Sequence, residues 1–119
     1  MDDAIRHALA TERIADITTI GRKSGLERRI EIWFHNVDGD IYLTGLPGRR
    51  DWYANLLTDP SIVLHLKQSV SADLEGTAVP ITDEDEKRRL LTEIRGRLTR
   101  HRDVNDWVMG SPLVRIDLD

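Results

Sequence analysis

The 119-residue sequence contains no cysteine, which excludes disulfide bonds, thiolate metal ligands and cysteine nucleophiles. Aromatic residues make up only 5% of the chain, and no apolar run approaches the roughly 20 residues that a membrane-spanning helix needs. The start, Met1-Asp2-Asp3, lacks the basic and then apolar order of a secretory signal. From these absences we expect a cytoplasmic protein that does not insert into a membrane.

An overall excess of basic residues is also missing. The 21 acidic residues outnumber the 17 basic ones, and the formal net charge is −4. General nucleic-acid binders usually carry a basic excess, so we expect no nucleic-acid partner. The basic residues instead form local clusters, at Arg22-Lys23 with Arg28-Arg29, and at Arg49-Arg50. Separate basic clusters on an acidic protein favour a small anionic ligand over a polymer.

Residues for metal or hydrolytic chemistry form no recognisable pattern. The four histidines lie far apart in the sequence and lack the spacing of metal ligands. We therefore predict no metal site. Neither a Ser/His/Asp grouping nor a pair of carboxylates for general acid–base catalysis can be argued from spacing. The sequence assigns no catalytic residue.

Alternating apolar and polar residues predict a fold built mainly from strands. The predicted strands cover residues 14–20, 28–34, 41–44, 61–67, 70–81 and 113–118. Asp38-Gly39 is a hairpin signal between the second and third strands. Helices are expected over residues 2–13, 51–57 and 83–102, the last being the longest, and an irregular segment over 103–111. Hairpins followed by a helix and a returning strand predict a mainly β (α+β) fold, a six-stranded antiparallel barrel in one domain over residues 1–119.

The same periodicities predict which apolar side chains are buried. In strands, alternate residues face the core, and in helices the core-facing residues recur every three or four positions. The residues expected to be mostly buried are Ile30, Ile32, Phe34, Leu64, Leu66, Leu90, Ile94 and Val114.

A basic loop joins the first two predicted strands. Gly21 and Gly25 bracket Arg22-Lys23-Ser24, and Arg28 follows as the next strand begins. Glycine adopts positive φ at little steric cost, so both ends of the loop can turn sharply. Backbone N–H groups in such a turn, beside guanidinium and ammonium groups, suit an anion. The alternative is a solvated hairpin tip that is basic without a ligand.

The few aromatic residues stand near cationic ones. Trp33 alternates with charged residues, Trp52-Tyr53 follows Arg49-Arg50, and Trp107 is the one large apolar residue of its segment. Large rings near cations could stack on a planar ligand with an anionic tail. The alternative is that these rings only cover the edges of the core.

Two motifs together resemble the deazaflavin-dependent nitroreductase and quinone reductase family. One is Thr18-Thr19-Ile20-Gly21-Arg22-Lys23-Ser24-Gly25, and the other is Asp51-Trp52-Tyr53-Ala54-Asn55-Leu56-Leu57, followed by Asp59-Pro60. The resemblance runs from about Ile14 to Asp85. It implies the split β-barrel fold of FMN-binding, pyridoxamine-phosphate-oxidase-like proteins, with flanking helices.

The resemblance also implies which residues form the site. The implied cofactor-binding residues are Arg22, Lys23, Ser24, Arg28, Thr44, Gly45 and Trp52. Arg22, Lys23 and Arg28 match positions that hold the phosphate and acidic tail of coenzyme F420, and Trp52 matches a residue that helps to close the coenzyme groove. Thr44 and Gly45 match the strand end beside the deazaflavin ring. The implied substrate-pocket residues are Trp33 and Trp107.

The activity implied by the resemblance is hydride transfer from reduced F420 to a small electrophilic acceptor, such as a quinone, enone or nitro compound. A homodimer is also expected, because split barrels of this size commonly pair. The sequence departs from the family in the loop from Leu46 to Arg50, which is several residues shorter than usual. The shortened loop keeps FMN, another flavin or, more distantly, haem open as the cofactor. The alternative function is a split-barrel flavin- or haem-binding protein without reductase activity.

Overall fold

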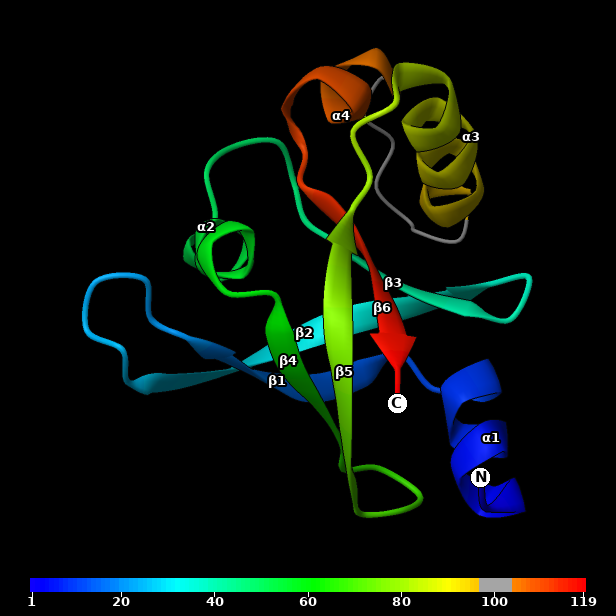
Figure 1. The fold of residues 1–119 in the computed structure, drawn as a ribbon. Helices are drawn as coiled ribbons and strands as arrows, with labels where there is room; N and C mark the ends of the chain where they lie inside the picture. The colour runs from blue at the N-terminus through cyan, green and yellow to red at the C-terminus, as the bar shows by residue number, and fades with distance from the viewer. Residues whose placement is uncertain (97–103) are drawn as a thin grey trace.

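The computed structural model describes residues 1–96 and 104–119 and is a closed, antiparallel, six-stranded barrel (Figure 1). Around the barrel the strands follow the order β1-β2-β3-β6-β5-β4. They are β1 (Ile14–Ile20), β2 (Glu27–Val37), β3 (Asp40–Thr44), β4 (Ser61–Leu66), β5 (Ala72–Pro80) and β6 (Leu113–Leu118). The helices of the described residues are α1 (Asp3–Thr11), α2 (Asp51–Thr58), α3 (Glu84–Arg95) and α4 (Val104–Gly110). The predicted six-stranded antiparallel barrel is confirmed.

Local turn chemistry sets the pairing of β2 with β3. Asp38 and Gly39 form a two-residue connection, and both have positive φ, at 54° and 90°. Two positive φ values in a two-residue loop match the right-handed twist of the flanking strands. The hairpin predicted from Asp38-Gly39 is therefore confirmed, with Val37 opposite Asp40.

Residue alternation divides the barrel into an inner and an outer face. Residues directly opposite each other in paired strands share a face, and Ala15 lies opposite Ile32 on β2 and Leu66 on β4. The inner face forms the main core. Its fully buried side chains include Ile17, Phe34, Leu43, Leu64 and Val114. Burial of these side chains is the main free-energy gain of the fold.

Helices α3 and α4 pack together on the outer face at one end of the barrel (Figure 1). Their apolar side chains form a second core with outward-facing residues of β2, β3 and β6. The buried members are Val37, Tyr42, Ile81, Leu90, Leu91, Ile94, Trp107, Val108 and Leu113. The Asp83 side chain caps α3 by accepting a hydrogen bond from the Glu86 N–H at 2.9 Å. The expectation of an irregular segment over residues 103–111 is wrong for residues 104–110, which form α4. This helix forms because packing against α3 stabilises it.

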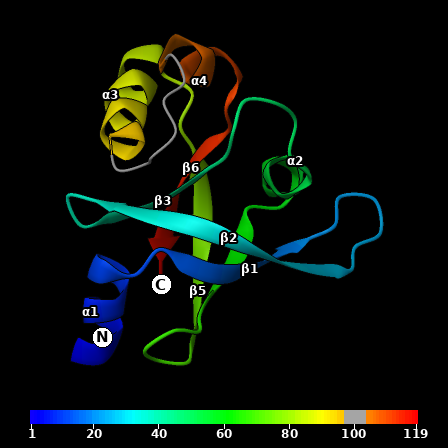
Figure 2. The same ribbon diagram turned by 180° about the vertical axis from the view of Figure 1, so that it is seen from behind.

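Helix α3 is the longest helix in the described part of the chain, as predicted. The predicted continuation over residues 97–102 lies outside the described residues. Helices α1 and α2 lie elsewhere on the barrel, with α2 beside the protruding β1–β2 hairpin (Figures 1 and 2). None of the described helices is long and apolar enough to cross a membrane.

The predicted burial of β2 is partly wrong. Phe34, Leu64, Leu66, Leu90, Ile94 and Val114 are buried, but Ile30 is 40% exposed and Ile32 is half-buried. Ile30 does lie on the inner face, opposite the buried Ile17. Its exposure has another cause, since β2 pairs with β3 only from Phe34 onward and the edge from Glu27 to Trp33 has no strand partner in the described residues. The inner face at Ile30 is therefore open to solvent.

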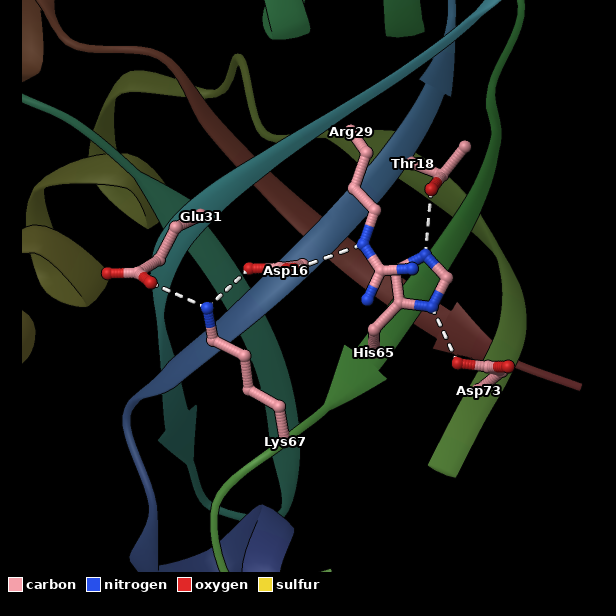
Figure 3. A network of polar contacts seen from close by, with 7 residues as sticks. All are labelled: Asp16, Thr18, Arg29, Glu31, His65, Lys67 and Asp73. Atoms are coloured by element: carbon pink, nitrogen blue, oxygen red, sulfur yellow. Dashed lines mark hydrogen bonds and ion pairs between the residues drawn. The ribbon is translucent and has the colours of Figure 1, made fainter. Parts of the chain in front are cut away.

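A polar network covers part of the outer face and joins four strands (Figure 3). The Asp16 carboxylate on β1 accepts hydrogen bonds from Arg29 Nε at 3.0 Å and from Lys67 Nζ at 2.7 Å. Lys67 Nζ also lies 2.5 Å from Glu31 on β2. The His65 ring on β4 lies between the Thr18 hydroxyl and the Asp73 carboxylate, 2.7 Å from each.

The Asp16 side chain is only 18% exposed and has two cationic partners. Hydrogen bonds from Lys67 and Arg29 lower the pKa of Asp16. A carboxyl group with a lowered pKa in the folded state stabilises the fold above its unfolded pKa of about 3.9, and this contribution is lost as the pH falls through the folded value. The network therefore makes stability dependent on pH in the acidic range.

We expect the free energy of unfolding of the Asp16→Asn variant to be about 1 kcal/mol lower than that of wild type at pH 7. The difference should shrink as the pH falls from about 4 toward the lowered pKa of folded Asp16, because in this range Asp16 of the unfolded wild-type chain binds a proton first. Urea unfolding at several pH values measures it. The control is Glu27→Gln, which removes a charge that has no ion pair in the described residues. An equal loss for Asp16→Asn at all pH values would contradict this account.

Candidate functional site

The basic loop between β1 and β2 is held in shape by its own backbone. Gly21 N–H donates to the Leu26 carbonyl, and Gly25 N–H donates to the Gly21 carbonyl, each at 2.8 Å. Gly25 has a φ of 70°, a conformation that other residues rarely adopt. The Ser24 hydroxyl accepts a hydrogen bond from the Leu26 N–H at 3.2 Å. The loop is thus a defined turn, held by its own hydrogen bonds.

Asn55 of α2 fastens this loop to the barrel. Its carbonyl oxygen accepts from the Arg22 backbone N–H at 3.1 Å and from Arg22 Nη1 at 3.0 Å. Its amide nitrogen donates to the Thr19 hydroxyl at 3.2 Å. Asn55 is 4% exposed, so these polar groups are bonded where water cannot replace their partners. The loop, the end of β1 and α2 therefore form one unit.

A cavity of about 590 Å³ lies between this unit and the inner face of β2. Its lining combines the basic loop, the exposed stretch of β2 and the first turn of α2. The lining residues are Thr19, Gly21, Arg22, Lys23, Ser24, Arg28, Ile30, Asp51, Trp52 and Asn55. The cavity is open at Ile30 because β2 continues there beyond its pairing with β3. Five residues predicted to bind the cofactor therefore meet in one place.

The three cations of the cavity differ in their partners. The Arg22 guanidinium is engaged within the protein, by Asn55 and by Asp51 Oδ1 at 3.2 Å. Lys23 and Arg28 form no ion pair or side-chain hydrogen bond in the described part of the chain. Arg28 lies on the inner face, opposite Thr19. Arg22 thus shapes the loop, while Lys23 and Arg28 are free to bind an anion.

Four of the predicted site residues lie elsewhere. Thr44, on the outer face beside Leu113, donates a hydrogen bond to the Pro112 carbonyl at 2.7 Å. Gly45 lies beside the Arg50 side chain, since a Cβ at this position would come within 3.2 Å of Arg50 Nε. Trp33 is 46% exposed and lies on the outer face of β2, since it alternates with the inward-facing Ile32. None of these residues lines the cavity.

Trp107, the other predicted substrate residue, is 3% exposed within the second core beneath α3 and α4. It does not line the cavity either. The wall of the barrel thus separates the predicted cofactor residues of the basic loop from the predicted substrate residues.

The sequence also contains a signal for the internal role of Asn55. Trp52, Asn55 and Leu56 follow the spacing of one helical face, and all three are buried. A polar residue on a buried face needs hydrogen-bond partners, so its position on α2 predicts an internal polar contact. Ile30 and Asp51 gave no comparable signal.

Solved structures of other proteins share the fold. The conserved protein Rv2991 from Mycobacterium tuberculosis superposes with a TM-score of 0.78 at 22% identity, over 99% of this chain and 81% of that one. A Listeria innocua protein assigned as a pyridoxamine 5′-phosphate oxidase gives 0.72 at 16%, over 98% and 92% of the two chains. A structure named F420 reductase gives 0.68 at 14%, over 100% and 96%. At these identities the likeness establishes the split-barrel fold alone.

No curated protein sequence matches this chain. The family model for F420H2-dependent quinone reductases matches residues 3–115, well beyond the two motifs that first suggested the resemblance. Members of that family are enzymes that use coenzyme F420 to reduce quinone-type acceptors. The chain is an oxidoreductase that belongs to the F420H2-dependent quinone reductase family.

Proposed function

We propose that the cavity between the basic loop, β2 and α2 is the site where this enzyme binds reduced F420 and from which a small electrophilic acceptor is reduced. The observation that carries the proposal is the pair of free cations, Lys23 and Arg28, in a cavity whose other walls include Trp52 and Ile30. A ligand with an anionic arm and an apolar ring system matches this combination of free cations and apolar walls. The volume of about 590 Å³ lies in the usual range for small-molecule sites.

Each residue has a distinct part in this proposal. Lys23 and Arg28 hold the phosphate through charge-assisted hydrogen bonds, and Ser24 offers its hydroxyl proton beside them. Arg22 keeps the loop in position through Asn55. Trp52, which is 7% exposed at the start of α2, gives the cavity a rigid wall.

When bound, reduced F420 supplies the hydride, and the protein supplies position and electrostatics. Because the cofactor supplies the hydride, the sequence needs no recognisable acid–base pair, and none is found. Quinones, enones and nitro compounds are the acceptor classes that we propose.

The roles of Thr44, Gly45, Trp33 and Trp107 stay predictions. Trp33 is exposed and can contact an acceptor only if that acceptor reaches the outer face of β2. Trp107 is buried with Leu90 and Val108, so its most direct effect is on the packing of α4.

We also propose that two copies of the chain form a dimer through the exposed part of β2. The unpaired edge from Glu27 to Trp33 offers backbone groups to a partner. Three large apolar side chains near it are exposed: Leu26 by 63%, Trp33 by 46% and Ile30 by 40%. Such an edge with apolar neighbours is a surface that a second copy would cover.

Light scattering at micromolar concentration tests the dimer. We expect a mass of twice the 13.6 kDa of one chain, because pairing buries the edge of β2 and its apolar neighbours. Leu26→Lys should shift the equilibrium toward the monomer, since it places a charge within the interface. A wild-type mass near 13.6 kDa would contradict the proposal.

Binding and turnover test the coenzyme site. Reduced F420 should bind to wild type and be oxidised when a quinone such as menadione is added without oxygen. Lys23→Ala and Arg28→Ala should each weaken binding by tenfold to a hundredfold, because each loses charge-assisted bonds that contribute about 1.5–3 kcal/mol. Fluorescence titration measures the affinity. Moderate salt should weaken wild-type binding more than that of either variant, since it screens charges that the variants lack.

The control is Arg6→Ala, which removes an exposed cation of α1 far from the basic loop. It should leave F420 affinity unchanged. The free energy of unfolding of Lys23→Ala without ligand should change by less than about 0.5 kcal/mol, since Lys23 is an exposed side chain. Identical F420 affinities for wild type, Lys23→Ala and Arg28→Ala would contradict the proposal that this cavity binds the coenzyme. Binding without oxidation of F420 would instead indicate a binding protein without reductase activity.

A further inference from the structure

The lining of the cavity includes a buried hydroxyl group whose proton has no acceptor among the described residues. Thr19, near the end of β1, lines the cavity and is only 2% exposed. Its Oγ1 accepts a hydrogen bond from Asn55 Nδ2 at 3.2 Å, and no described residue accepts a bond from it. A buried hydroxyl without an acceptor has lost a hydrogen bond to water, so a ligand that supplies the acceptor binds more tightly.

The direction of this proton is set by Arg22 through Asn55. The backbone N–H and the Nη1 of Arg22 both donate to Asn55 Oδ1. The amide oxygen therefore faces Arg22 and the NH2 group faces Thr19, because the reverse orientation would place N–H groups against N–H groups. Since the NH2 group of an amide only donates, the Thr19 hydroxyl has to accept there, and its own proton points away from Asn55.

Thr19 also stands beside one of the two free cations. On the inner face it lies directly opposite Arg28, in a pair whose Cβ atoms are typically about 4.5–5.5 Å apart. Two residues further along the chain, a Cβ at Gly21 would lie 3.5 Å from Arg28 Nε. The Arg28 side chain thus lies beside the end of β1, so an anion held by Arg28 adjoins the Thr19 hydroxyl.

We propose that Thr19 is a coenzyme-binding residue, whose hydroxyl donates a hydrogen bond to a phosphate oxygen of F420 alongside Arg28. This inference rests on the proposed coenzyme site. A phosphate oxygen fits this position because it is an ionised acceptor, and hydrogen bonds to ionised groups are about twice as strong as those between neutral groups. The bond favours the coenzyme over its deazaflavin nucleoside, which lacks the phosphate arm and leaves the Thr19 proton unpaired.

The experiment compares wild type, Thr19→Val and Thr19→Ser in their affinity for F420 and for the deazaflavin nucleoside. Valine keeps the branched shape of threonine but has no hydroxyl, so Thr19→Val should weaken F420 binding by about tenfold, as expected for one hydrogen bond to a charged group. Thr19→Ser keeps the hydroxyl and should bind F420 within about twofold of wild type. All three proteins should bind the nucleoside equally.

The matched control is Thr18→Val. Thr18 precedes Thr19 on β1 and lies on the outer face, and its hydroxyl also contacts a buried side chain, that of His65, at 2.7 Å. Its loss should leave F420 affinity unchanged. Thr19→Ala removes the hydroxyl without placing a methyl group against the Asn55 amide, and it gives the same comparison if Thr19→Val does not fold.

Loss of the Thr19 hydroxyl also removes a partner of Asn55, so the position of the basic loop needs its own readout. The salt dependence of F420 binding provides it, because Lys23 contributes to that dependence only while the loop holds it beside the ligand. Added salt should weaken F420 binding to Thr19→Val by the same factor as binding to wild type. A salt dependence reduced to that of Lys23→Ala would mean that Thr19 acts through the loop, and would overturn the inference.

Two other results would overturn the inference by itself. In one, wild type binds F420 and Thr19→Val binds it as tightly; in the other, Thr19→Val loses as much affinity for the nucleoside as for F420. Weaker binding of F420 alone, with an unchanged salt dependence, would support the inference. Failure of wild type to bind F420 would overturn the proposed coenzyme site and this inference together.

Discussion

The buried amide of Asn55 is the contact on which the arrangement of the site depends. It joins α2 to the basic loop through Arg22 and to the end of β1 through Thr19. Because Asn55 is itself only 4% exposed, loss of any one of its partners leaves a buried polar group unpaired, at a cost of about 1–3 kcal/mol. The loop is thereby held in position before a ligand arrives. Binding then requires less ordering of the protein, which favours affinity.

The second constraint is where strand pairing ends. Strand β2 has 11 residues, but only its last four pair with β3. Along that paired end the inner face is packed core, as at Phe34, while along the unpaired stretch the same face is a cavity wall, as at Ile30. The outer face instead carries the network around Asp16, and the ion pairs of this network cross from strand to strand. One strand thus contributes to core, cavity and outer network.

Local patterns predicted the strands, the Asp38-Gly39 hairpin and most of the core, because alternation and turn chemistry act between near neighbours. The exposure of Ile30 was not predictable in this way, since it depends on where β3 leaves β2. Helix α4 has seven residues and was missed because its stability comes from packing on α3. The family resemblance assigned residues of the basic loop to coenzyme binding; these residues line a cavity, and their binding role stays a prediction. The period of two could have separated Trp33 from Arg28, as they occupy odd and even positions of one strand.

The central claim is that the anionic arm of F420 lies on the inner side of the barrel wall, between Lys23 and Arg28. A crystal structure of the complex with oxidised F420 tests this claim most directly. The account predicts phosphate oxygens within hydrogen-bonding distance of Lys23 Nζ and the Arg28 guanidinium, with Arg22 still bonded to Asn55. A coenzyme bound on the outer face beside Trp33, with Lys23 and Arg28 left in solvent, would contradict it.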